Sequence, residues 1–135
     1  YNSNGIGLAA VQVGILKRIV VIDISTKDGK RKPMSFINPS IKKLSDETSV
    51  YEEGCLSIPN TFIKIERPKT CEVEYIDIEG NKKNLICDGL LSTCLQHEIN
   101  HLDGKLIIDY LSKLKRDLII KKISKFKESP DRIIV

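Results

Sequence analysis

Two histidines four residues apart, with a glutamate directly after the first, constrain this chain more than any other feature. They are His97, Glu98 and His101 within the stretch 96–101 (Gln-His-Glu-Ile-Asn-His), and the chain has no other histidine. Residues i and i+4 lie on one face of an α-helix, so both imidazoles can reach one metal ion. Glu98 can then accept a proton from water at that ion. The stretch predicts a metal-binding helix, although this spacing also arises by chance.

The composition is typical of one globular domain. The chain has 135 residues, of which 41% are hydrophobic and 30% are charged, and its net charge is +4. No apolar run is as long as a membrane span, and no stretch has the layout of a signal peptide. The mild positive charge does not require a nucleic-acid partner. We therefore expect a single domain over 1–135 in the cytoplasm, without direct DNA binding or membrane insertion.

The cysteines also bear on the compartment. There are four, Cys55, Cys71, Cys87 and Cys94, so an even number is available for disulfides. Their density is below that of a stapled secreted scaffold, and the chain is long enough to fold without bridges. No CxxC pair exists, which argues against a structural zinc ribbon. We expect reduced thiols, one of which could be a metal ligand.

Most of the chain before the metal motif has the character of β-strands. The range 17–24 is rich in β-branched residues and predicts a buried strand. A second short strand is expected at 34–38, ended by Pro39. Alternating apolar and polar residues predict a meander of antiparallel strands at 62–66, 70–77 and 82–87.

The segment 5–12 contains two glycines and two alanines among apolar residues. Such residues let the backbone approach a ligand or another segment closely. A tight packed turn explains the pattern as well as a binding site does. Gln12 is the one polar side chain there, which makes it notable.

The metal motif lies in a predicted helix from about 89 to 102. Asp88 is a suitable N-cap, and Gly104 supplies a left-handed stop. Leucines flank the face that carries Cys94 and the motif, so we expect a largely buried helix packed against the sheet.

A second helix is expected after Ser112. Apolar residues recur there at helical spacing, at Leu114, Leu118, Ile119, Ile123 and Phe126. Basic residues crowd its other side: Lys113, Lys115, Arg116, Lys121, Lys122, Lys125 and Lys127. A solvated face explains these charges, and a docking surface for an acidic partner is the alternative.

A catalytic site of this kind needs a third protein ligand and one open position. The long metzincin pattern requires a histidine six residues after His101, where Ile107 stands. A thermolysin-like protease needs a downstream glutamate, and only Glu128 is available, close to the end of the chain. Cys94 would make one helix supply all three ligands. Cys55, on a backbone constrained by neighbouring glycine and proline, is better placed, but the residues alone leave the choice open.

Three stretches together resemble the signature motifs of the peptide deformylase family, in the same order. They are Gly5-Ile6-Gly7-Leu8-Ala9-Ala10-Val11-Gln12, Glu53-Gly54-Cys55-Leu56-Ser57 and Gln96-His97-Glu98-Ile99-Asn100-His101. The linking segments around 37–39 and 88–91 also fit, so the likeness covers nearly the whole chain. The resemblance implies an α+β fold in which antiparallel and mixed β-sheets pack around a central metal-binding helix, with a helix at the C-terminal end.

The resemblance also implies a metal site. Cys55, His97 and His101 would bind one divalent ion, with Fe(II) as the native metal and Zn(II), Ni(II) or Co(II) able to replace it. The reaction would remove the formyl group from N-formyl-methionyl nascent peptides and release formate. Glu98 would act as general base toward the attacking water and then as general acid toward the leaving amine.

Further roles follow from the same resemblance. The Gln12 amide and the backbone N–H of Leu56 would stabilise the developing oxyanion. Glu53 and Arg67 would form an ion pair that holds the cysteine segment in place. The methionine side chain would enter an apolar pocket formed by Ile6, Gly7, Tyr51, Gly54, Leu90 and Cys94.

Two departures from the family pattern stand out. Asn100 occupies a position where the family usually has aspartate, so a hydrogen bond beside the metal loses its charge. The chain also begins just before the first motif, and we expect an N-terminal segment to be missing.

Other readings of the same residues remain. A zinc metallopeptidase would use a carboxylate as third ligand, and a catalytically impaired deformylase-like protein would act as a binding module. A ribosome contact through the basic C-terminal helix is a further expectation. A bacterial member would be cytoplasmic, and a eukaryotic one would lie in an organelle.

Overall fold

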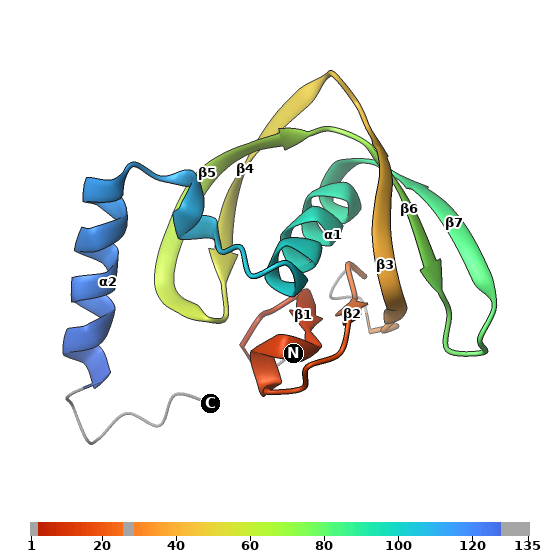
Figure 1. Ribbon diagram of the computed structural model, residues 1–135, viewed down its shortest axis with the longest axis horizontal. Helices are drawn as coiled ribbons and strands as arrows, with labels where there is room; N and C mark the ends of the chain where they lie inside the picture. Colours follow the sequence, from red (N-terminus) through yellow and green to blue (C-terminus); the bar gives the residue numbers. More distant parts are fainter. Residues whose placement is uncertain (1–2, 26–28, 128–135) are drawn as a thin grey trace.

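The computed structural model describes residues 3–25 and 29–127, which form two β-sheets, two α-helices and two short 3₁₀-helices (Figure 1). The elements are β1 (Gly7–Ala9), η1 (Ala10–Val13), β2 (Ile19–Ile22), β3 (Met34–Leu44), β4 (Thr48–Cys55), β5 (Ile58–Pro68), β6 (Cys71–Ile76), β7 (Lys82–Cys87), α1 (Gly89–Leu102), η2 (Ile107–Tyr110) and α2 (Lys113–Lys127). Sheet order is β1-β2-β3-β6-β7 in the larger sheet and β4-β5 in the smaller one, and every pair described is antiparallel.

The helix α1 lies at the centre, with the larger sheet on one side and the β4–β5 hairpin on the other (Figure 1). Leu95 and Ile99 are buried in the main core together with Val20, Phe36 and Val73. Full burial of each such side chain contributes about 1.5–3 kcal/mol. This packing confirms the predicted α+β fold around a central helix.

The predicted ends of α1 are confirmed, with one difference. Asp88 has the extended backbone of an N-cap, but its side chain makes no capping hydrogen bond. Gly104 has φ +76°, and Lys105 N donates to Asn100 O at 2.8 Å. The left-handed glycine therefore ends the helix as its sequence position predicts.

A second, smaller core attaches the C-terminal part of the chain to the hairpin. Ile63 and Ile65 of β5 pack against Ile107 and Ile108 of η2. Of the predicted apolar face of α2, only part is used: Ile119 and Ile123 pack on this core, whereas Leu114 and Leu118 are exposed. The predicted contribution of Phe126 falls on a side chain outside the described residues.

The prediction that Pro39 ends a strand is wrong, because β3 continues through it to Leu44. The ladder to β6 is irregular between Ile37 and Ser40, and Asn38 has a positive φ of 49°. Proline is tolerated inside a sheet at such bulges because no ladder hydrogen bond is required of its nitrogen.

The predicted meander is also partly wrong. β6 and β7 pair as expected, but β5 pairs with β4 in a separate sheet and not with β6. Alternation of polar and apolar residues identifies a strand without naming its partner, and the segment that forms β4 carried no clear pattern.

The glycine-rich segment forms a short strand and a 3₁₀ turn. Gly7 pairs with Ile22, and Ala9 pairs with Val20. β1 therefore joins the edge of the larger sheet close to α1, which places the segment beside the metal motif.

Among the described residues, no helix is long and apolar enough to cross a membrane.

Candidate metal centre

Cys55 is the last residue of β4, at the tight turn into β5. The hairpin register shifts between Gly54 and Cys55, so that Cys55 pairs with Ile58. Such a bulge redirects the side chain that follows it. Cys55 thus lies on a strand end and not in the open loop that its glycine and proline neighbours favour, and its sulfur faces α1.

Three donor atoms converge where this turn meets α1. Cys55 Sγ lies 3.2 Å from His101 Nε2, and His101 Nε2 lies 3.2 Å from His97 Nε2. All three atoms are within 4.8 Å of one another, and in the described parts of the chain no other such group was found. A thiolate with two imidazoles suits Fe(II), Zn(II), Ni(II) and Co(II), which are borderline metals. The residues present therefore fit one divalent ion.

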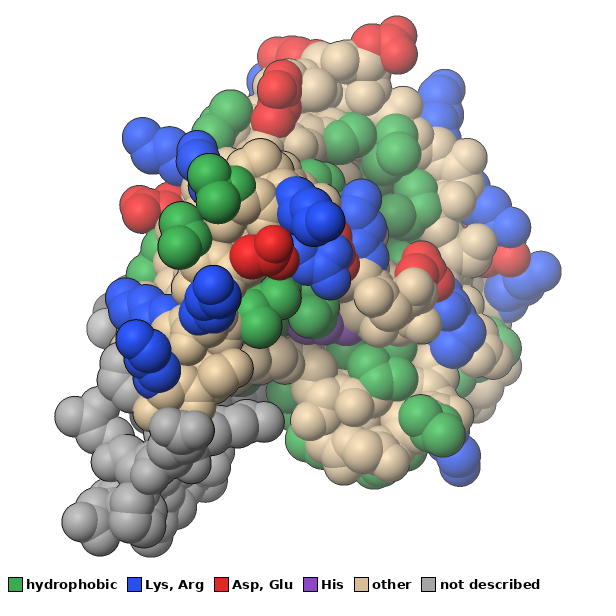
Figure 2. All heavy atoms as spheres, turned by 60° about the vertical axis from the view of Figure 1, so that its left-hand side comes forward, with side chains coloured by type: hydrophobic (Ala, Val, Ile, Leu, Met, Phe, Trp, Pro, Cys, Tyr) green, Lys and Arg blue, Asp and Glu red, His purple; other side chains and the backbone are tan. Residues whose placement is uncertain are grey.

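The electrostatics of this cluster favour a thiolate beside a cation. Burial alone would raise the pKa of the Cys55 thiol, but hydrogen bonds from His101 and His97 lower that pKa to about 6. Burial alone would lower the pKa of His97, but its hydrogen bonds to Cys55 and Glu53 raise it to about 9. A metal cation bound between the sulfur and the ring nitrogens can replace the positive charge of protonated His97. In Figure 2, histidine is visible only within a narrow opening.

A buried ion pair stands directly behind His97. Arg67 donates two hydrogen bonds to Glu53, from Nε to Oε2 at 2.7 Å and from Nη2 to Oε1 at 2.9 Å. Glu53 Oε1 is also 2.8 Å from His97 Nδ1. Burial raises the pKa of Glu53, but the bonds to His97 and Arg67 outweigh it and hold that pKa below its usual value. The carboxylate therefore orients His97 with Nε2 toward Cys55 and His101.

Glu98 is almost completely buried beneath β1. A Cβ atom added to Gly7 would lie 2.8 Å from Glu98 Oε1 and 2.8 Å from Cys94 Sγ, so only glycine fits above this carboxylate. Glu98 Oε2 is buried and has no hydrogen-bond partner among the described residues. Burial raises the pKa of Glu98 to about 7, against the nearby histidines, which lower it. A carboxyl group with such a pKa can take up and release protons near neutral pH.

Gln12 joins η1 to the cysteine hairpin. Its Oε1 accepts a hydrogen bond from Ala9 N at 2.8 Å, and its Nε2 donates to Ser57 Oγ at 3.0 Å. Leu56, the residue between Cys55 and Ser57, borders a pocket that opens beside the cluster. The structure thus brings Gln12 to the turn that follows Cys55, where Leu56 also lies.

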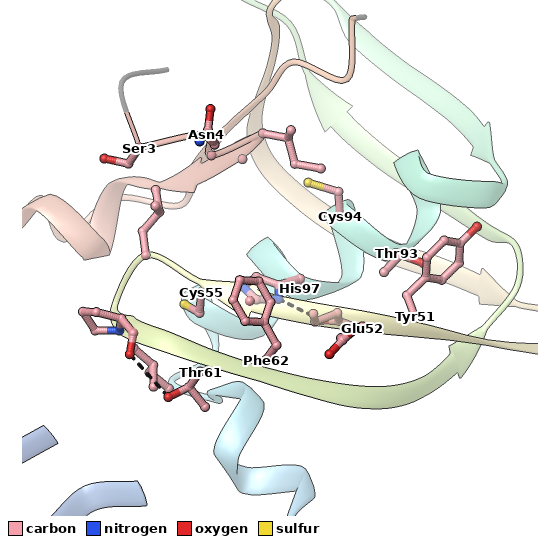
Figure 3. Close-up of a pocket in the computed structure, with 18 of the residues that line it drawn as sticks. Ser3, Asn4, Tyr51, Glu52, Cys55, Thr61, Phe62, Thr93, Cys94 and His97 are labelled. Atoms are coloured by element: carbon pink, nitrogen blue, oxygen red, sulfur yellow. Dashed lines mark hydrogen bonds and ion pairs between the residues drawn. The ribbon is translucent and has the colours of Figure 1, made fainter. Parts of the chain in front are cut away.

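A pocket of about 620 Å³ opens beside the cluster. All six residues expected to form it border it: Ile6, Gly7, Tyr51, Gly54, Leu90 and Cys94. Figure 3 shows Thr93, Cys94 and His97 on α1, with Cys55 of the β4–β5 hairpin close to His97.

Sequence reasoning missed Phe62, Thr93 and Ser57. Phe62 is 69% exposed and pairs with Gly54 across the hairpin. Only the register of the hairpin could have pointed to it. Thr93 directly precedes Cys94 on α1, and its buried hydroxyl has no partner among the described residues. Ser57 belongs to the second motif, but nothing local indicates its bond to Gln12.

Comparison with known proteins gives a consistent picture. The family model described as "Polypeptide deformylase" matches residues 1–117. A peptide deformylase of Pelagibacter ubique is 59% identical over 135 residues, covering 100% of this chain and 77% of that protein. One of Rhizobium meliloti is 52% identical over 125 residues, covering 93% and 72%. The crystal structure of an Ehrlichia chaffeensis peptide deformylase with actinonin superposes with a TM-score of 0.88 at 43% identity, covering 95% of this chain and 77% of that one.

Proposed function

The chain belongs to the peptide deformylase family, and we propose that Cys55, His97 and His101 hold the metal ion of its reaction. The protein is a metal-dependent hydrolase that removes the N-formyl group from formyl-methionyl polypeptides. The observation that carries the site assignment is the convergence of one sulfur and two ring nitrogens within 4.8 Å. This thiolate-containing donor set differs from the carboxylate set of a zinc metallopeptidase.

We propose Fe(II) as the native ion, with Zn(II), Ni(II) or Co(II) able to replace it. When bound, a divalent ion supplies Lewis acidity that polarises the formyl carbonyl and makes water more acidic. Glu53 fixes the tautomer of His97, because its carboxylate accepts the Nδ1–H and leaves Nε2 free for the ion.

Glu98 carries the protons in this proposal. Its carboxylate accepts a proton from the attacking water and donates it to the leaving amine, while formate departs with the former carbonyl carbon. The raised pKa of about 7 suits both steps, since the group must exist in both forms during turnover. The close cover of Gly7 keeps the carboxylate out of bulk water.

The negative charge that develops on the formyl oxygen needs hydrogen-bond donors. We assign these to the Gln12 side-chain amide, which reaches Ser57 from η1, and to the backbone N–H of Leu56, which directly follows Cys55 in the hairpin turn. Loss of one such donor typically costs about 2.7–4 kcal/mol of barrier. Gln12 Nε2 must exchange its bond with Ser57 for one with substrate, a short rotation of an otherwise fixed side chain.

The methionine side chain of the substrate is assigned to the pocket of about 620 Å³. Leu90 and Cys94 present apolar atoms from α1, and Ile6 does so from the segment before β1. An unbranched thioether fits such a surface without unsatisfied polar groups. The Ehrlichia relative binds actinonin, and we propose that this pocket binds it too.

We propose a cytoplasmic location and a ribosome contact through α2. Leu114 and Leu118 are exposed on this helix. Its basic residues within the part whose side chains are described are exposed as well: Lys113, Lys115, Arg116, Lys121, Lys122 and Lys125. Figure 2 shows basic side chains spread over this side of the molecule. Such a surface suits the acidic backbone of ribosomal RNA.

An anaerobic assay with formyl-Met-Ala-Ser tests the function. The Ni(II)-loaded chain should release formate and leave Met-Ala-Ser intact, and Glu98→Gln should abolish release while retaining the ion. Cleavage between methionine and alanine would indicate a metallopeptidase. A folded, metal-loaded chain that releases no formate would support the impaired binding module.

A further inference from the structure

Arg67 is held along both edges of its guanidinium group. Along one edge, Nε and Nη2 donate hydrogen bonds to Glu53. At the other edge, Nη1 donates to Asn100 Oδ1 at 2.7 Å and to the Tyr110 hydroxyl at 3.1 Å. The Tyr110 hydroxyl in turn donates to Asn100 Oδ1 at 3.0 Å. The three side chains therefore form a closed triangle of hydrogen bonds.

This triangle joins three elements at the metal cluster. Arg67 comes from β5, Asn100 from α1 directly before His101, and Tyr110 from the end of η2. The Arg67 side chain is only 3% exposed, so water cannot replace a hydrogen-bond partner that Arg67 loses. Its carbon also lies 5.0 Å from the centre of the Tyr110 ring. The ring and the hydroxyl thus restrain the same cation.

Asn100 alone is a weak anchor for Arg67. A neutral amide oxygen accepts a weaker hydrogen bond from a cation than a carboxylate does. An amide can also turn by 180° and present its NH₂ group to the cation. The Tyr110 hydroxyl prevents this turn, because it donates to Oδ1, and it offers Nη1 a second acceptor.

We propose that Tyr110, together with Asn100, is a positioning residue of the metal centre. Tyr110 and Asn100 hold the guanidinium of Arg67 in place. Arg67 in turn positions Glu53, and Glu53 orients His97 through Nδ1. The inference rests on the proposed metal ligands and adds that the hydroxyl of Tyr110, which is 39% exposed, raises their affinity for the metal ion. Partners that orient a ligating histidine usually change metal affinity 10–100-fold when removed. Tyr110 acts through two intervening side chains, so about tenfold is expected.

The test is the metal affinity of Tyr110→Phe, measured by competition with a chromophoric chelator for Co(II). The variant keeps the ring and removes only the hydroxyl. Its Co(II) dissociation constant should rise about tenfold, and the Co(II) absorption bands should shift because His97 is less well oriented. Tyr75→Phe is the matched control, since Tyr75 packs against Phe36 in the larger sheet. That control should bind as the wild type does.

A rescue variant separates positioning from general stability. In the background of Tyr110→Phe, Asn100→Asp supplies a charged acceptor for Arg67 that needs no hydroxyl to orient it. This double variant should recover most of the lost affinity and the wild-type Co(II) bands, whatever its unfolding midpoint in urea. Absence of recovery would overturn the proposal and leave Tyr110 with a structural role.

Two different results separate the proposed metal ligands from the role of Tyr110. A wild-type chain that binds no Co(II) would contradict the proposed metal ligands and this inference with them. A wild type that binds one ion, beside a Tyr110→Phe variant with equal affinity and an unchanged spectrum, would overturn this inference alone.

Discussion

Cys55 Sγ lies 3.2 Å from His101 Nε2, although 46 positions separate the two residues in the sequence. The contact closes the β4–β5 hairpin against α1, and the proposed metal site sits at that closure. The position of the sulfur therefore depends on two structures at once, the bulge before Cys55 and the buried packing of α1.

Metal binding should protect Cys55 from thiol reagents. Cys55 is the only partly exposed cysteine among the described residues, whereas Cys71, Cys87 and Cys94 are buried. Burial also raises the pKa of Cys94, so this thiol stays protonated and unreactive at pH 8. The metal-free chain should show one fast-reacting thiol with DTNB at pH 8, and excess Zn(II) should block it. Fast labelling of Cys94, or equal labelling of Cys55 with and without Zn(II), would contradict this.

Gly7→Ala should impair catalysis while leaving the ligands in place. The added methyl would meet Glu98 Oε1 at 2.8 Å and displace the carboxylate. Displacement of a catalytic group by about 1 Å can cost 10²-fold in rate. Formate release should fall by about that factor at unchanged metal content. Gly5→Ala is the control, because its methyl meets only the flexible end of Leu56, and it should cost much less.

Gln12→Ala should lower the rate of the chemical step. If its amide stabilises the oxyanion, kcat should fall about 10²–10³-fold with a small change in KM. Ser57→Ala removes only the group that holds Gln12 Nε2 in the resting structure, so its effect should be smaller. Steady-state kinetics on a formyl-methionyl peptide measures both. An equal loss in the two variants would show that the bond to Ser57, and not a bond to substrate, is what matters.

Arg67→Met should destabilise the metal-free protein strongly. The change removes the buried guanidinium that makes two bonds to Glu53 and leaves this carboxylate only its bond to His97. Breaking a buried ion pair costs about 3–5 kcal/mol. Lys69→Met is the comparison, because it breaks an exposed ion pair with Glu47. The urea midpoint should fall sharply in the first variant and hardly move in the second. Similar midpoints in the two variants would be inconsistent with this view of Glu53.

Local patterns were sufficient for the metal helix. The spacing of His97 and His101, the left-handed glycine at Gly104 and the leucines that flank the motif are all features of one continuous segment. The fold and family followed from the resemblance of three such segments. The structure contains each of these features because each depends only on residues that are close together in the sequence.

Contacts between segments were beyond the reach of the same reasoning. The passage of β3 through Pro39 depends on a bulge, and the bulge depends on the register with β6. The bond of Gln12 to Ser57 and the approach of Tyr110 to Arg67 join residues more than 40 positions apart. No periodicity records such pairs, because each residue is locally ordinary and only the tertiary fold brings them together.

The central claim is that one ion held by Cys55, His97 and His101 is required for deformylation. It is tested most directly by anaerobic titration of the metal-free chain with Ni(II), with bound metal and formate release measured on the same samples. Formate release should rise in proportion to occupancy and reach its limit at one ion per chain, and Cys55→Ala should neither bind tightly nor release formate. Full release by Cys55→Ala, or by the metal-free wild type, would contradict the account.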